Sequence, residues 1–180
     1  MDPITVSTTI ARPREEVFDY LIDFANHPEF TDHFLQGWRL TREDSYGRGA
    51  GGRFRVKQRL NRFGFGDLTF SEVEAPRLLV AHGRGGKFNR DRTVAVWELE
   101  PASGSETRVR LTIETVPALL TDKVMEFLRG TRGFHKRRWG KALRRLRSIL
   151  EDDEGRGRRA TIAGGARKPA TGTPLRHPQD

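Results

Sequence analysis

The side chains of this chain that can exchange protons near neutral pH are five histidines, at positions 27, 33, 82, 135 and 177. No histidine follows another at a spacing of four residues, and the chain has no cysteine that could complete a ligand set. The sequence therefore predicts no metal site, and no cofactor is expected. His82 and His135 are the candidates for acid–base catalysis if they reach an interior cavity. The alternative is that each is a packed or surface residue.

Large aromatic side chains and one amide are the candidates for contact with a ligand. Gln58 shares the apolar phase of an alternating segment with Phe54 and Val56. A buried amide needs hydrogen-bond partners, so we expect Gln58 to orient a polar group of a ligand or to bond a neighbouring group or water. The predicted ligand-binding residues are Phe30, Trp38, Phe54, Gln58, Phe70, Trp97, Phe127 and Phe134. The alternative is that the aromatic residues form an ordinary core.

A glycine-rich segment, Gly47–Gly52, fits the pattern G-x-G-x-x-G. A dinucleotide site would require a helix immediately after it, with its N-terminus facing the pyrophosphate. The residues that follow, RFRVKQRL, alternate like a strand. The pattern therefore favours a hairpin loop over a nucleotide site.

Positive charge is concentrated near the end of the chain. The net charge is +9, and residues 121–150 contribute +8, from ten basic side chains against Asp122 and Glu126. Such a basic face could be merely solvated, could contact an anionic membrane surface, or could bind nucleic acid phosphates. Nucleic acid is the least favoured partner, because Trp139 is the only aromatic residue expected among the exposed arginine clusters.

The order of predicted elements indicates an α+β fold. Residues 4–10 alternate as a half-buried strand, and residues 13–27 follow as a short helix that Pro28 should end. Five or six strands separated by turn signals are expected between residues 37 and 115, and then one long amphipathic helix over 119–150. We expect one domain, residues 1–150, and a disordered tail, residues 151–180, because the tail has few large apolar residues. No apolar run is long enough to span a membrane, so a cytoplasmic protein is expected.

Several of these segments together resemble the START/birch-pollen-allergen-like superfamily, also called SRPBCC or polyketide cyclase/dehydrase-like. The matching pieces, over roughly residues 3–150, are ITVSTTI, the helix at Ala11–Phe24, the H-P-x-F break at His27–Phe30, the strand join at Glu72–Val80, the W-x-L-x-P strand at Trp97–Pro101 and the terminal helix.

The resemblance implies a helix-grip fold, in which a strongly curved antiparallel sheet wraps around a long C-terminal helix, with two short helices after the first strand. It implies binding, and possible transport or sequestration, of a hydrophobic or amphipathic small molecule such as a lipid, quinone or polyketide. In such a fold the cavity wall is also the core. Two alternatives stay open: an aromatase/cyclase-like enzyme acting on a polyketide in the same cavity, and an interaction module that uses the basic helix. Oligomeric state and ligand identity are left open.

Overall fold

The first strand of the chain pairs with a strand about a hundred residues further along, as its position predicts. The structure is a computed structural model that describes residues 3–57, 64–86, 90–116, 131–154, 157, 159–162 and 166–167. In it, β1 (Ile4–Ile10) lies antiparallel to β7 (Thr107–Val116), with Ile4 opposite Ile113.

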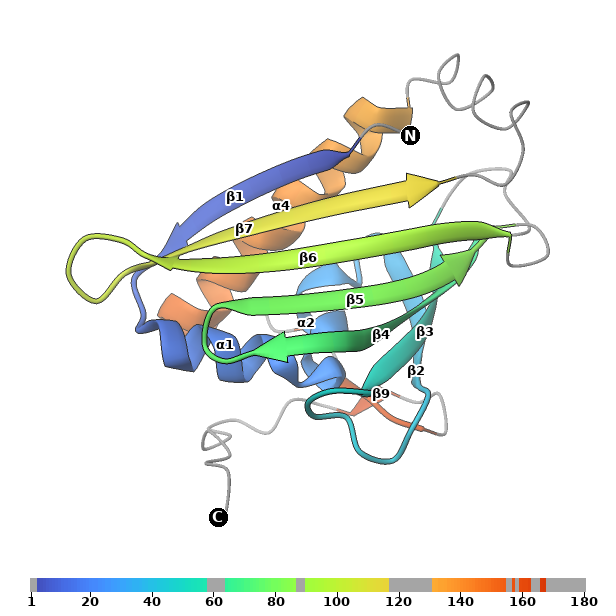
Figure 1. Ribbon diagram of the computed structural model, residues 1–180, viewed down its shortest axis with the longest axis horizontal. Helices are drawn as coiled ribbons and strands as arrows, with labels where there is room; N and C mark the ends of the chain where they lie inside the picture. Colours follow the sequence, from blue (N-terminus) through green and yellow to red (C-terminus); the bar gives the residue numbers. More distant parts are fainter. Residues whose placement is uncertain are drawn as a thin grey trace.

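Seven antiparallel strands form one curved sheet (Figure 1). Their spatial order is β1-β7-β6-β5-β4-β3-β2, so from β2 to β7 each strand pairs with the next along the chain. The strands between the two ends of the chain are β2 (Leu35–Leu40), β3 (Gly51–Val56), β4 (Phe65–Glu74), β5 (Leu78–Gly85) and β6 (Asp91–Pro101).

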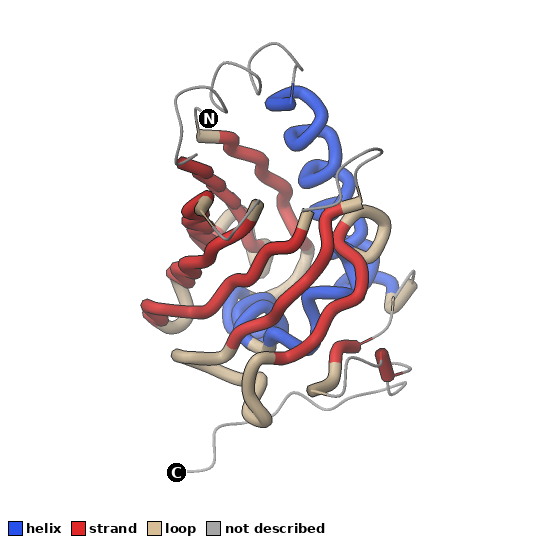
Figure 2. The backbone as a smooth tube through the Cα atoms, turned by 90° about the vertical axis from the view of Figure 1, so that its right-hand side faces the viewer, coloured by secondary structure: helices blue, strands red, loops and turns tan. Residues whose placement is uncertain are grey.

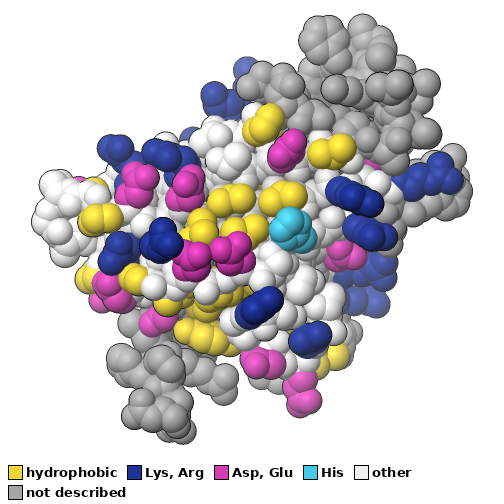
Figure 3. All heavy atoms as spheres, viewed as in Figure 1, with side chains coloured by type: hydrophobic (Ala, Val, Ile, Leu, Met, Phe, Trp, Pro, Cys, Tyr) yellow, Lys and Arg dark blue, Asp and Glu magenta, His cyan; other side chains and the backbone are white. Residues whose placement is uncertain are grey.

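The two faces of the sheet differ as the alternating sequence predicts. In β6, Ala95, Trp97 and Leu99 are buried, whereas the residues between them are partly exposed. Figure 3 shows the outer face, where acidic and basic side chains are interspersed with hydrophobic ones. The inner face is therefore the one that builds the core.

The long helix α4 (Thr131–Asp152) lies on the inner side of the sheet with the shorter helices (Figure 2). Leu143, Leu146 and Ile149 on its apolar stripe are buried. Its C-terminal carbonyls are satisfied by Arg12, which donates to Leu150 O at 2.7 Å. The part of the predicted helix before residue 131 lies outside the described residues. The helix-grip prediction is confirmed.

Three short helical pieces follow β1. Helix α1 (Arg14–Ile22) begins after Pro13, the 3₁₀ turn η1 (Phe24–Asn26) follows, and α2 (His27–Thr31) comes next. Pro28 lies in the first turn of α2, where its missing N–H costs nothing. The chain therefore breaks at Asp23 rather than just before the proline, and Pro28 starts a helix instead of ending one.

Part of the segment predicted as a disordered tail is packed against the domain. Residues 159–160 form β8, which pairs with β9 (Ala166–Arg167), and Ala160 is buried in the core. The prediction relied on the scarcity of large apolar residues, whereas here small residues pack closely instead. Residues 168–180 lie outside the described residues. Within the described part of the chain, no helix is long and apolar enough to cross a membrane.

Candidate functional site

Aromatic rings from seven elements meet around His27 on the inner side of the sheet. Phe24 stacks on the imidazole, with 4.4 Å between ring centroids, and Trp97 meets it edge-on at 6.0 Å. The aromatic cluster consists of Phe24, His27, Phe30, Trp38, Phe54, Phe70, Trp97 and Trp139. All of its members except Trp139 are buried, and Trp139 is half-buried.

Burial keeps the His27 ring neutral. It lowers the pKa of His27 from 6.5 to about 4, outweighing the opposing effects of the bond to Leu21 and of Asp23. His27 Nε2 lies 2.8 Å from Leu21 O, and a carbonyl oxygen can only accept, so Nε2 carries the proton. Nδ1 of the neutral ring therefore keeps its lone pair.

Trp38 brings a polar atom into the aromatic cluster. Its side chain is 6% exposed, and among the described residues no acceptor bonds its indole Nε1–H. The ring lies against Gly52, where a Cβ would come within 2.9 Å of two of its atoms. An unsatisfied buried donor costs about 1–3 kcal/mol, and an acceptor on a bound molecule would remove that cost.

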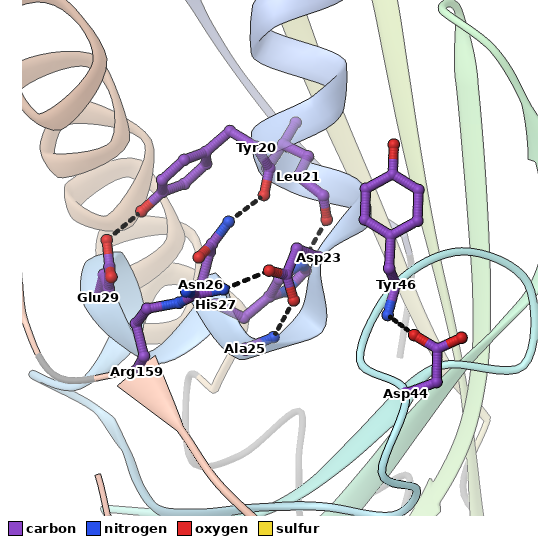
Figure 4. A network of polar contacts seen from close by, with 10 residues as sticks. All are labelled: Tyr20, Leu21, Asp23, Ala25, Asn26, His27, Glu29, Asp44, Tyr46 and Arg159. Atoms are coloured by element: carbon purple, nitrogen blue, oxygen red, sulfur yellow. Dashed lines mark hydrogen bonds and ion pairs between the residues drawn. The ribbon is translucent and has the colours of Figure 1, made fainter. Parts of the chain in front are cut away.

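Asp23 organises the start of the wall that carries His27 (Figure 4). Its Oδ1 accepts the backbone N–H of Ala25 at 3.0 Å and so caps η1. Its other oxygen, Oδ2, forms an ion pair with Arg159 of the C-terminal segment. One carboxylate therefore serves both the helix cap and a contact with a distant part of the chain.

Helix α2 is held from two further directions. The Tyr20 hydroxyl of α1 donates to Oε2 of the fully buried Glu29 at 2.8 Å. Arg145 of α4 donates to the Glu29 carbonyl at 3.0 Å and forms an ion pair with Asp32. These bonds fix the helix whose other residues belong to the aromatic cluster.

Five of the predicted ligand-binding residues come together in the aromatic cluster: Phe30, Trp38, Phe54, Phe70 and Trp97. Gln58 and Phe127 lie outside the described residues. Phe134 of α4 is 41% exposed, and the guanidinium of Arg138 lies 3.7 Å from its ring centroid. Phe134 is therefore a surface residue and does not line the interior.

Neither predicted acid–base histidine joins the aromatic cluster. His82 is exposed and follows the buried Ala81 in β5, so it lies on the outer face of the sheet. His135 is half-buried on α4 beside Phe134, and burial, followed by the charge of Arg138, lowers its pKa.

The predicted ligand-binding residues did not include three members of the aromatic cluster: Phe24, His27 and Trp139. The H-P pair was interpreted as a chain break and as one piece of the family resemblance, not as part of a site. The spacing of Phe24, His27 and Phe30 at three residues was the available signal, because it places all three on one side of a tight helix.

The described residues contain no group of three His, Asp or Glu side chains that could hold a metal ion. The glycine-rich segment leads into β3, because Gly51 and Gly52 are its first residues. The phosphate-binding helix that a dinucleotide site needs is thus replaced by a strand.

The exposed charges of helix α4 between residues 131 and 150 are all positive. Between residues 131 and 150 the sequence has eight basic and no acidic side chains. Two of them form ion pairs, Arg145 with Asp32 and Arg147 with Glu151. Lys136, Arg137, Lys141 and Arg144 are exposed. We call these four residues with Arg138 and Phe134 the basic face.

The curved sheet around a long helix places the protein in the START/birch-pollen-allergen-like superfamily, whose domains generally bind hydrophobic ligands. Residues 11–151 match the family described as activator of Hsp90 ATPase homolog 1-like protein, and the chain belongs to that family. No curated protein matches the sequence.

Solved structures share the fold at low identity. The KanY protein has 16% identity and a TM-score of 0.65, over 82% of this chain and 96% of that one. DynU16, a putative protein in the dynemicin biosynthetic locus, has 17% identity and a TM-score of 0.57, over 86% of this chain and 49% of that one. The Aha1 dimer from Colwellia psychrerythraea has 16% identity and a TM-score of 0.56, over 86% of this chain and 100% of that one.

Proposed function

We propose that the protein binds an uncharged, largely apolar small molecule that carries a hydrogen-bond acceptor, between the sheet and the helices. Lipids with carbonyl groups, quinones and aromatic polyketides meet this description. The observation that carries the proposal is the Trp38 Nε1–H, which is buried within the aromatic cluster without an acceptor among the described residues. Burial of the ligand against the rings would supply affinity, and the indole would supply orientation.

The charge state of the interior supports an uncharged ligand. His27 is neutral at physiological pH because its pKa is about 4, so the aromatic cluster offers no cation to pair with a carboxylate. A charged ligand would lose its hydration without compensation. The proposal therefore excludes free fatty acid anions as the preferred cargo.

Flavone and 2-phenylnaphthalene test the role of Trp38, because both are aromatic and only flavone has a carbonyl acceptor. We expect Trp38→Phe to keep the ring packing and to weaken flavone binding about tenfold, the loss of one hydrogen bond of roughly 1.4 kcal/mol. Binding of 2-phenylnaphthalene should stay within about twofold. Isothermal titration calorimetry measures both affinities.

Two results would contradict the proposal. Failure of either compound, and of a panel of quinones and neutral lipids, to bind or to raise the melting temperature would remove the ligand-binding function. Equal weakening of both compounds in Trp38→Phe would show that the ring, and not its N–H, matters.

A cyclase-like enzyme is the second candidate, and the unprotonated Nδ1 of the buried His27 favours it. A neutral imidazole among aromatic rings could accept a proton from a folded polyketide. If so, His27→Gln should bind a stable aromatic product normally and fail to accelerate the cyclisation of a poly-β-keto thioester. Equal product formation with and without wild-type protein excludes this candidate.

The basic face supports a third proposal, that the protein contacts anionic membrane surfaces. Phe134 is exposed next to Arg138, and an aromatic side chain among cations suits a lipid interface. Sedimentation with phosphatidylcholine vesicles should require added phosphatidylserine, and it should weaken in Phe134→Ala and at high salt. Salt-sensitive binding to RNA, or to the Hsp90 that the family description names, without vesicle binding would point to an interaction module instead.

A further inference from the structure

The chain continues past the family match, and that continuation is attached to the domain. The match ends at residue 151, whereas Gly157, the strand β8 (Arg159–Ala160) and Thr161 lie against η1, α2 and β2. We call residues 157 and 159–162 the C-terminal strap. It lies beyond the family match, and its contacts involve the wall that carries His27.

The first half of the strap requires a glycine. The Gly157 N–H donates to Glu29 O at 3.1 Å. A Cβ on Gly157 would lie 2.9 Å from that oxygen and 2.7 Å from Asp32 Oδ2. The backbone therefore approaches α2 more closely than any residue with a side chain allows.

The second half is attached by charge, burial and backbone bonding. Arg159 forms its ion pair with Asp23, and both side chains are largely screened from solvent. Ala160 is only 4% exposed and belongs to the core. Thr161 O accepts the N–H of Leu40, on the free edge of β2, at 3.2 Å. Gly157, Arg159 and Ala160 thus each have a separate physical reason for their residue type, which distinguishes the strap from a tail that merely lies on the surface.

The elements beneath the strap are too short to hold themselves in place. The turn η1 has three residues and α2 has five, far below the length at which a helix is stable alone. Their inner sides carry Phe24, His27 and Phe30. Because Asp23 both caps η1 and holds Arg159 (Figure 4), release of the strap would also loosen the start of this wall.

We propose that the C-terminal strap is a latch on the wall formed by η1 and α2, and that its release admits ligand to the aromatic cluster. The buried members of that cluster cannot contact a ligand unless an element that covers them moves. With the latch as a gate, the rates of association and dissociation both scale with the open fraction, and the affinity stays nearly constant. The gating rests on the proposed ligand-binding function, whereas attachment of the strap does not.

Two variants of the full chain release the latch in different ways. Asp23→Asn keeps a side-chain oxygen to cap η1 and removes the charge that pairs with Arg159. Gly157→Ala adds the Cβ for which there is no room. Glu43→Gln is the matched control, because Glu43 is an exposed carboxylate between β2 and β3.

Hydrogen exchange without ligand tests the attachment. We expect the amide of Leu40 to exchange about tenfold faster in both latch variants, and that of Gly157 in Asp23→Asn. The amides of the β1–β7 pair, and all amides of Glu43→Gln, should keep the wild-type rates. Unchanged exchange at Leu40 and Gly157 would overturn the latch, and so would equal acceleration throughout the sheet, which would show general destabilisation.

Stopped-flow tryptophan fluorescence with flavone tests the gating. We expect association and dissociation rate constants in both latch variants to rise at least about fivefold, with less than about twofold change in Kd. Faster exchange with unchanged rate constants would overturn the gate, and so would a loss of affinity without faster association. If flavone and the other apolar probes do not bind wild-type protein, the ligand function and the gate both fail, and exchange still decides whether the strap detaches.

Discussion

The role of His27 becomes apparent only in the structure, where aromatic rings surround its side chain. In the sequence it precedes a proline and has no histidine partner, so only its three-residue spacing from Phe24 and Phe30 sets it apart. In the structure, Phe24 stacks on its ring and the Leu21 carbonyl accepts a hydrogen bond from its Nε2–H. The residue identity was visible, but its surroundings depend on strands far along the chain, such as β6 with Trp97. The sequence near His27 therefore could not predict which residues surround it.

The same burial predicts a pH-dependent stability. The pKa of His27 is about 4 in the folded protein and near 6.5 when the chain is unfolded, so the unfolded chain binds the proton more tightly. The stability from the neutral ring is complete above pH 6.5 and is lost as the pH falls towards 4, by about 3 kcal/mol in total. Urea unfolding of wild type and His27→Phe at pH 7 and pH 4 measures the difference. If both free energies of unfolding fall in parallel, His27 is not buried as a neutral ring.

At the scale of elements, the sequence predicted strands and missed small-residue packing. Strands were expected between residues 37 and 115 because alternation indicates one buried face, and β3, β4, β5 and β6 lie there. The C-terminal strap was predicted to be disordered because its segment has few large apolar residues, which are the ones that a hydrophobicity pattern detects. Gly157 and Ala160 attach the strap because they are small enough for its backbone to lie close to the domain. A hydrophobic pattern does not detect this kind of packing.

The end of α4 offers a test of how one element secures another. Arg12, in the turn after β1, donates from Nε to Leu150 O and from Nη2 to Glu151 O. These carbonyls otherwise have no partner within the helix. We expect Arg12→Ala to lower the free energy of unfolding by about 2 kcal/mol, measured by urea unfolding followed by circular dichroism. Arg144→Ala, at an exposed position of the same helix, should change it by less than about 0.5 kcal/mol. Equal effects would show that general loss of charge, and not the cap, is responsible.

For the whole molecule, the order of elements was enough to predict an α+β fold, and the family resemblance specified the helix grip. A strand at the start, a run of strands in the middle and one long helix at the end leave few ways to cover the inner face of the sheet. Part of the candidate site followed from this, because Trp38, Phe70 and Trp97 occupy inward positions of their strands. Its polar features did not follow: neither the unbonded N–H of Trp38 nor the neutral state of His27 can be inferred without the neighbours that surround them.

The uneven charge of the molecule leads to a prediction about its stability. The outer face of the sheet mixes both signs (Figure 3), whereas α4 has no acidic residue between positions 131 and 150. Lys141 is exposed, and it lies four residues from both Arg137 and Arg145, so it takes part in two like-charge pairs. We expect Lys141→Glu to convert both to attractive pairs and to raise the free energy of unfolding by about 1 kcal/mol at low salt.

Salt decides whether this gain is electrostatic. At about 1 M NaCl the Debye length is roughly 3 Å, so the advantage of Lys141→Glu over wild type should disappear in urea unfolding. Lys141→Gln should show about half the gain at low salt, because it removes repulsion without adding attraction. A gain that persists at high salt would mean that helix propensity or packing is responsible. A loss at low salt would mean that the positive charge of α4 is already compensated within the fold, and the basic face would then have no surplus charge to offer an anionic surface.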